Sequence, residues 1–452
     1  MIVNEETKKA YSGSSDKKLN IVFPELSLNI PMSQIYNQSM NLVEMLIDSD
    51  NIEFVGCIAS KFEIQISGIF QYIKGKKIEV SINADDTEEI PLFKGIVDTA
   101  ERQTNRNYKK IVAFDELYTK GNIDVAGWYN GLSFPLSLKS VRDSLFLYVG
   151  IEQTEIELPN DNILVNKIDI SNSLKAINVM KAICQINGAF GIINRQGLFE
   201  YRILKEPKSK RGAFPGLTLF PPFYPGVIYE EDGNKVEVKD VPFYKKVDYE
   251  EYTVKPVEKV TIRQTDSDVG VTYGNGTNNY IIQGNMFTIN LSEDTLRTIA
   301  QNVHTNISNI EFVPFSSDNS GYPFVEVGLD AVSYYSYNFE ASARARSNDV
   351  YTKKTFHVFK RTLSGIQALK DNYEAQGEEY QSEFITDLGM RIESVKQDVG
   401  RQIETKLPEF TYTKAEINEM FGNQLRVLSV SALPANPQPN TLYLIQGEVT
   451  VS

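Results

Sequence analysis

Alternation of apolar and polar residues dominates the first quarter of the chain and predicts β-strands. In KKIEVSIN, residues 76–83, isoleucine and valine alternate with polar side chains, the period of two that a half-buried strand requires. Residues 38–48, QSMNLVEMLID, have a spacing that predicts a short amphipathic helix instead. Three further segments have strand character, with Pro24 interrupting the first: 19–29, 90–103 and 108–118. We therefore expect an antiparallel meander, with NRN as the turn between the segments 90–103 and 108–118.

Helical spacing replaces this alternation at several places further along. LSLKSVRDSLFLYVG (136–150) predicts one helix, and a second should begin near Ser171 and end at Asn187-Gly188, a helix-stop signal. AFGIINRQGLFEYRIL then predicts a hairpin with NRQG as its turn, and DVGVTYGNGTNNYIIQG a wider hairpin. A further helix should start after Ser292, an N-cap residue followed by two acids.

From about Leu363 the spacing is again helical and contains a repeat. DLGMRIE (387–393) recurs as DVGRQIE (398–404), a shift of 11 residues. An 11-residue period keeps an apolar stripe on a nearly straight helix, and Pro408 should end it. Some 40 residues of helix would reach about 60 Å.

This stripe predicts a parallel trimeric coiled coil, because the stripe is narrow and β-branched residues occupy successive positions on it. The alternative is a helix that packs on its own chain. The predicted oligomerisation seam comprises Ile366, Leu369, Phe384, Leu388, Ile392, Val395, Val399 and Ile403. Beyond it, YTKAEINEMFG predicts a short capped helix and the last residues one or two strands.

The chain of 452 residues is too long for one hydrophobic core. The fold class predicted is α+β and mainly β. The predicted domains are a β-rich domain at 1–135, an inserted α+β unit at 136–204, a Pro/Gly-rich connection with strands at 205–262, a second β-rich domain at 263–362, the coiled coil at 363–407, and a short helix with C-terminal strands at 408–452.

Composition narrows the function. The formal charge of −13 disfavours a general nucleic-acid binder. Cys57 and Cys184, the only cysteines, are too few for a disulfide framework or a zinc site and are interpreted as two buried small residues. No stretch approaches the roughly 18 apolar residues of a membrane span, and no signal peptide is evident, so we expect synthesis in a cytoplasm without stable membrane insertion.

Candidate chemistry is sparse. His304 and His357 lie outside any catalytic motif and are assigned structural or surface roles. Two acidic clusters, Asp85–Glu89 and Glu230–Asp232, have the carboxylates that glycoside hydrolysis or calcium binding needs, but both lie in predicted turns. YGNGTNN lacks the Lys-Ser/Thr of a phosphate-binding loop. Trp128 could be a sugar platform or a packing anchor. No active site, metal site or cofactor is expected.

The order of several motifs resembles that of tail hub proteins of long-tailed bacteriophages, including the N-terminal part of tail-associated lysins. The segments that carry the resemblance are LFKGIVDTAERQTNRNYKKIVAFDELY, LKAINVMKAICQINGAFGIINRQGLFEYRIL, FKRTLSGIQALKDNYEAQGEEY, YTKAEINEMF and LPANPQPNTLYLI. Lysin-type members continue into a hydrolase, whereas this chain stops at Ser452, and we therefore expect no enzymatic activity.

The resemblance implies a homotrimer in a phage virion, assembled in the host bacterial cytoplasm. Two tail-tube-like β-barrel domains per subunit would give a ring below the distal tail ring protein and the tail tube. The coiled coil would carry receptor-binding or tip proteins, and DNA would pass through an acidic lumen without specific binding. The alternatives are a trimeric fibre that adheres to the host surface and a cell-wall hydrolase.

Overall fold

The computed structural model describes residues 4–47, 56–102, 107–168, 170, 173–206, 237–241, 244–265, 267–337, 351–379, 384–387, 426–430 and 441–445. The chain divides into two compact units, Met1–Gly389 and Met390–Ser452. In the second unit, β23 (Arg426–Val430) pairs with β24 (Thr441–Ile445) in parallel.

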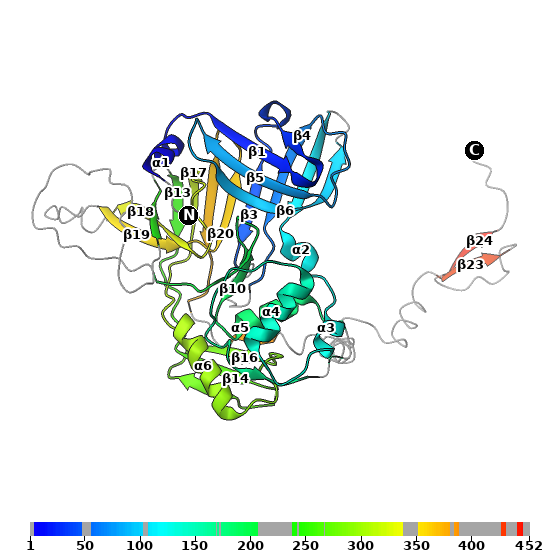
Figure 1. The fold of residues 1–452 in the computed structure, drawn as a ribbon, viewed down its shortest axis with the longest axis vertical. Coiled ribbons are helices and arrows are strands. Elements are labelled where there is room, and N and C mark those ends of the chain that lie inside the picture. Colours follow the sequence, from blue (N-terminus) through cyan, green and yellow to red (C-terminus); the bar gives the residue numbers. More distant parts are fainter. Residues whose placement is uncertain are drawn as a thin grey trace, which may run out of the picture. The chain divides into compact units, whose positions relative to one another are not determined.

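An eleven-stranded sheet, sheet A, is the main element of the first unit (Figure 1). Its strand order is β13-β17-β21-β20-β3-β4-β7-β6-β5-β1-β2, so strands from both ends of the unit lie in one sheet. The strands are β1 (Lys17–Phe23), β2 (Leu28–Ile30), β3 (Asn41–Met45), β4 (Lys61–Ser67), β5 (Lys77–Ala84), β6 (Ile90–Arg102), β7 (Tyr108–Phe114), β13 (Tyr244–Tyr249), β17 (Phe315–Ser320), β20 (Lys360–Ser364) and β21 (Lys370–Ala375).

The meander predicted from alternation is confirmed. In β5 the apolar residues Ile78, Val80 and Ile82 are buried and the polar ones between them are not. β5, β6 and β7 pair antiparallel in succession. Pro24 ends β1 and begins the 3-10 helix η1 (Pro24–Leu26), since its ring fixes φ and removes a backbone donor. Short helices α1 (Glu5–Ser12) and η2 (Met32–Gln34) flank this half of the sheet.

The expected α+β elements are also present. Helix α4 (Leu138–Val149) is capped by Ser137, and α5 (Ala176–Gln185) begins later than predicted. Gly188 follows α5 at φ +59°, where a side chain would be strained. The predicted hairpin is formed by β10 (Phe190–Ile193) and β11 (Phe199–Arg202). The smaller elements here are α2 (Glu116–Lys120), α3 (Ala126–Asn130), β8 (Leu136–Ser137) and β9 (Leu164–Val165).

A four-stranded sheet packs with helix α6 (Glu293–Ile307), which Ser292 caps as predicted. Its order is β15-β14-β16-β22, formed by β15 (Val271–Gly274), β14 (Lys259–Arg263), β16 (Asn279–Gln283) and β22 (Phe384–Asp387). The wide hairpin predicted for 268–284 is therefore wrong. β14 lies between β15 and β16 and pairs antiparallel with the first and parallel with the second.

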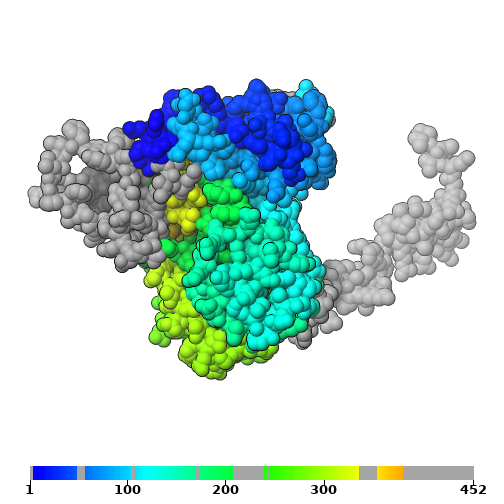
Figure 2. Space-filling view, viewed as in Figure 1, coloured from blue at the N-terminus to red at the C-terminus, as the bar shows by residue number. Residues whose placement is uncertain are grey.

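A three-stranded sheet completes the first unit. β18 (Asp330–Tyr337) lies between β12 (Glu237–Asp240) and β19 (Tyr351–His357). Figure 2 shows the N-terminal strands of sheet A in blue, the α4–α5 region in cyan and the α6 region in lime.

Two predicted helices are strands in the structure. Residues 41–45, expected within a helix at 38–48, form β3, whose buried positions are Leu42 and Glu44. The helix expected from Leu363 is contradicted over its first part, because 360–364 and 370–375 form the hairpin β20–β21 in the middle of sheet A. Residues 384–387 are strand β22. In each case pairing with neighbouring strands overrides a local helical spacing.

Two of the predicted domain boundaries lie within strands. Those at 262 and 362 fall inside β14 and β20. The N-terminal strands and the later strands β13, β17, β20 and β21 share one sheet. The mainly β character predicted from the sequence is confirmed, whereas closure into two barrels and the trimeric coiled coil stay predictions.

Candidate functional site

The predicted seam residues separate into three groups. Ile366 and Leu369 are buried between β20 and β21 of their own chain, so they pack in a hairpin and not on a helix. Phe384 begins strand β22, which pairs with Tyr280 of β16 in register. The remaining five, Leu388, Ile392, Val395, Val399 and Ile403, lie outside the described residues, and the oligomerisation seam stays a prediction there.

The segment RTLSGIQAL instead leads to a buried charged cluster. Arg361, on β20, is fully buried, and its guanidinium donates to both carboxylate oxygens of Asp371 on β21 at 2.9 Å. Its Nη1 donates to Glu44 on β3 at 3.1 Å, and Glu44 also lies 3.6 Å from Arg195 in the turn after β10. We call Arg361, Asp371, Glu44 and Arg195 the Arg361 cluster.

The electrostatics of this cluster are balanced. Burial lowers the pKa of Arg361, but the carboxylates of Asp371 and Glu44 outweigh burial and raise it above its ordinary value. Tyr373 donates its hydroxyl to Asp371 at 2.8 Å, and the Tyr322 N–H donates to the same carboxylate at 3.3 Å. Burial raises the pKa of Asp371, and the Arg361 guanidinium and the hydrogen bonds from Tyr373 and Tyr322 act against this rise.

Four buried cations also converge on one largely buried loop, residues 321–330, called the buried loop. Arg195 donates to the carbonyls of Pro323 and Val325 at 2.6 and 2.7 Å. Arg202 of β11 donates to the Val327 carbonyl, and Lys239 of β12 to the Phe324 carbonyl. Arg361 reaches the Tyr322 carbonyl at 3.4 Å.

These contacts provide hydrogen-bond donors for the backbone carbonyls of the loop. A loop without strand partners leaves its carbonyls unsatisfied, which is costly when the loop is buried. The four cations come from sheet A, from the β10–β11 hairpin and from the three-stranded sheet. The buried loop is therefore the joint at which three parts of the first unit meet.

A small cavity adjoins this joint. It holds about 10 Å³ and is lined by Glu44, Asp115 and Arg195 among others, which is roughly the space of one water molecule. Asp115 accepts backbone N–H groups from Ser60 at 2.6 Å and Leu117 at 2.9 Å, and so caps α2. Burial raises the pKa of Asp115 to about 7, against the lowering effect of these hydrogen bonds.

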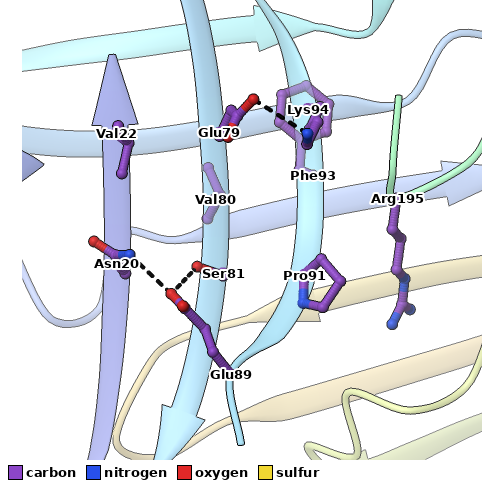
Figure 3. A pocket seen from close by; sticks show the side chains of 10 residues that line it. All are labelled: Asn20, Val22, Glu79, Val80, Ser81, Glu89, Pro91, Phe93, Lys94 and Arg195. Carbon is purple, nitrogen blue, oxygen red and sulfur yellow. Dashed lines mark hydrogen bonds and ion pairs between the residues drawn. The ribbon is translucent and has the colours of Figure 1, made fainter. Parts of the chain in front are cut away.

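A shallow groove lies on the outer face of β1, β5 and β6, with Arg195 at its edge (Figure 3). Its volume is about 240 Å³. Within it, Glu89 accepts from Ser81 and Asn20, and these two hydrogen bonds lower the pKa of Glu89. Glu79 pairs with Lys94 at 3.2 Å. Both carboxylates of the groove are therefore engaged by side chains of the same chain.

The acidic cluster Asp85–Glu89 belongs to the turn after β5, as predicted. Asp85 adopts φ +50° and accepts from the Asp16 N–H at 2.9 Å, and Glu88 accepts from Asn4 and Thr7 of the α1 cap. These carboxylates hold the N-terminal segment against the sheet. The second cluster, Glu230–Asp232, lies outside the described residues.

The histidines and the glycine-rich loop have structural roles. His304, on α6, contacts the Glu258 carbonyl at 3.0 Å, whereas His357 is fully buried, and burial lowers its pKa to about 4. The loop at 273–279 turns its N–H groups toward the chain's own Glu258, which accepts from Thr277 and from Asn278 at 2.9 Å. Backbone hydrogen bonds from Asn278 and Thr277 lower the pKa of Glu258. A carboxylate therefore occupies the position that a bound anion would take.

Trp128 lies on α3, donates to Ser144 at 3.0 Å and packs beside Tyr148, so it anchors α3 to α4. In the part of the chain that the structure describes, no three His, Cys, Asp or Glu side chains gather as a metal site. No helix among the described residues is long and apolar enough to cross a membrane.

Comparisons with known proteins find no matching family model and no matching curated protein. Among solved structures, the chain is similar to the tail protein from Neisseria meningitidis MC58, with 10% identity and a TM-score of 0.44 over 80% of this chain and 97% of that one. It is also similar to the prophage MuSo2 43 kDa tail protein from Shewanella oneidensis, with 10% identity and a TM-score of 0.45 over 80% and 98%. The prophage tail protein gp18 from Listeria monocytogenes EGD-e aligns with 8% identity and a TM-score of 0.43 over 79% and 94%.

Proposed function

We propose that the chain is a structural protein of a bacteriophage tail, a homotrimeric hub at the distal end of the tail tube. In this role it contacts the tail tube and the distal tail ring protein on one side and receptor-binding or tip proteins on the other. DNA passes through its lumen without specific binding. The proposal starts from the motif resemblance, which places strand, helix–hairpin and RTLSGIQAL segments in the order of hub proteins.

The observation that carries the proposal is sheet A. It joins β1–β7 with β13, β17, β20 and β21, so two β-rich parts of the chain, separated by the α+β region, form one continuous scaffold. The buried loop 321–330 and the Arg361 cluster fix the α+β region to that scaffold. A rigid scaffold without an assembled catalytic site in the described residues suits a load-bearing part better than an enzyme.

The test is the solution mass of the full chain by light scattering, alongside the double variant Leu388→Asp/Ile392→Asp. We expect a trimer that the variant weakens, so that it dissociates on dilution, and negative-stain images of the trimer with threefold rings. Particles with an elongated stalk and a distal head would favour an adhesive fibre instead. A chain that is monomeric, both alone and when mixed with tail tubes of its phage, would contradict the hub.

A further inference from the structure

The two cysteines, far apart in the sequence, meet in the core. The sulfur atoms of Cys57 and Cys184 lie 3.7 Å apart, and 127 positions separate the residues. Both thiols are buried and both are free. They are the only cysteines of the chain, so each has a single thiol neighbour inside its own molecule.

The backbone around the pair is held in place from both sides. Cys57 forms a parallel β-bridge with Gly191 of β10, and the Gly191 N–H donates to the Gly56 carbonyl at 2.7 Å. Cys184 lies near the end of α5, the helix that precedes β10. A Cβ atom on Gly191 would come within 2.6 Å of the Cys57 sulfur. Glycine at this position therefore leaves the space that the Cys57 side chain occupies.

We propose that Cys57 and Cys184 form a latent disulfide, which closes when the folded protein meets a peroxide or a comparable two-electron oxidant. The bond would tie the segment before β4 of sheet A to α5 of the α+β region. The sulfurs need to approach from 3.7 Å to roughly 2 Å, through rotation about the two Cα–Cβ bonds.

The chemistry balances with hydrogen peroxide as oxidant. One thiolate attacks an oxygen of the peroxide, the O–O bond breaks, and a sulfenic acid and hydroxide form. The second thiol then attacks the sulfenic sulfur, and water leaves as the S–S bond forms. The two sulfurs lose two electrons in total, and the two peroxide oxygens leave as water.

Burial makes this reaction slow and conditional. Burial raises the pKa of the Cys184 thiol, and its contact with Cys57 raises it further, so little thiolate is present at neutral pH. The pair is therefore expected to stay reduced in a reducing cytoplasm and to oxidise gradually outside one. This inference does not depend on the tail role, although a virion released from its host would experience that change.

The test uses the full chain, reduced and then exposed to hydrogen peroxide or to diamide under native conditions. Remaining thiols are blocked with N-ethylmaleimide, and the protein is digested without reduction. We expect a time-dependent loss of both alkylated cysteines and a single cross-linked peptide pair containing residues 57 and 184. The oxidised protein should also unfold at a higher urea concentration than the reduced one, since the bond constrains the unfolded chain.

Cys57→Ser and Cys184→Ser are the matched controls, because each keeps one buried thiol. Neither should gain urea resistance with oxidant, and any disulfide in them has to join two molecules, which a non-reducing gel detects. Consumption of the thiols without the cross-linked peptide would overturn the proposal. A wild-type protein that keeps two free thiols after prolonged oxidation would also overturn it, because the two thiols would then serve only as core packing that the oxidant does not reach.

Discussion

Replacement of Arg361 by Met tests whether the Arg361 cluster holds the first unit together. Methionine has a similar length and keeps much of the packing volume, but it removes the guanidinium. Asp371 and Glu44 would then remain buried, with side chains 0% and 9% exposed. The Tyr322 carbonyl would also lose a donor.

The expected loss of stability follows from these contacts. Removing one partner of a buried ion pair costs about 3–5 kcal/mol, because the remaining charge is left uncompensated. Asp371 keeps the Tyr373 hydroxyl and Glu44 keeps Arg195, so we expect a value near the lower end, about 3 kcal/mol. The double variant Arg361→Met/Asp371→Leu should be less destabilised than Arg361→Met alone, because it removes the stranded carboxylate as well.

Strand β20 supplies a matched control one residue away. Lys360 pairs with Glu374 on β21 at 2.8 Å, but this pair is partly exposed. Lys360→Met should therefore cost at most about 1 kcal/mol. The assay is urea unfolding followed by circular dichroism, with hydrogen exchange of the β20–β21 amides. If Arg361→Met and Lys360→Met unfold at the same urea concentration, the cluster does not stabilise the joint.

Three smaller changes test other parts of the fold. Burial lowers the pKa of His357 from 6.5 to about 4 in the fold. The free energy of unfolding should therefore fall by about 3 kcal/mol as the pH falls from 6.5 to 4. His357→Leu should flatten that part of a plot of the urea midpoint against pH. Burial raises the pKa of Asp115 from 3.8 to about 7, so the protonated carboxyl stabilises the fold increasingly as the pH falls from 7 toward 3.8. Asp115→Asn should lose this gain in stability in the same plot. An unchanged slope would contradict the raised pKa of Asp115. Ser292→Ala removes the cap that accepts from Thr295 and should destabilise α6 by about 1 kcal/mol, measurable as faster hydrogen exchange in its first turn; equal exchange rates would exclude the capping role.

Elements with unmixed local signals could be predicted from the sequence. β5 shows alternation without exception, and α6 has both an N-cap and a buried apolar stripe. Pro24 and Gly188 mark ends that the structure keeps. In these places propensity, periodicity and tertiary packing all favour the same conformation, which is the condition for reading structure from a single sequence.

The two strands or hairpins that were predicted as helices share one physical cause. In β3 the inward positions are Leu42 and Glu44, and in β20–β21 they include Arg361 and Asp371. A charged residue on the buried face breaks the alternation that identifies a strand, and the remaining apolar residues of the hairpin happen to recur at helical spacing. The Arg361 cluster could not be predicted from the sequence, because Arg361 and Glu44 are 317 residues apart and pair only once the sheet has formed.

Because β20, β21 and β22 are strands, the segment left for a C-terminal coiled coil is shorter than the sequence predicts. With strands up to Asp387, a helix from there to Pro408 would span only some 20 residues, or about 30 Å. Helices of that length containing Gly389 and Gly400 are marginal alone. A stable trimer would therefore need contacts from the first unit as well as the seam. In that case Leu388→Asp/Ile392→Asp should leave a weaker trimer that dissociates as the protein is diluted. If the seam alone held the trimer, the variant would be monomeric at every concentration. Light scattering on a dilution series distinguishes these two outcomes.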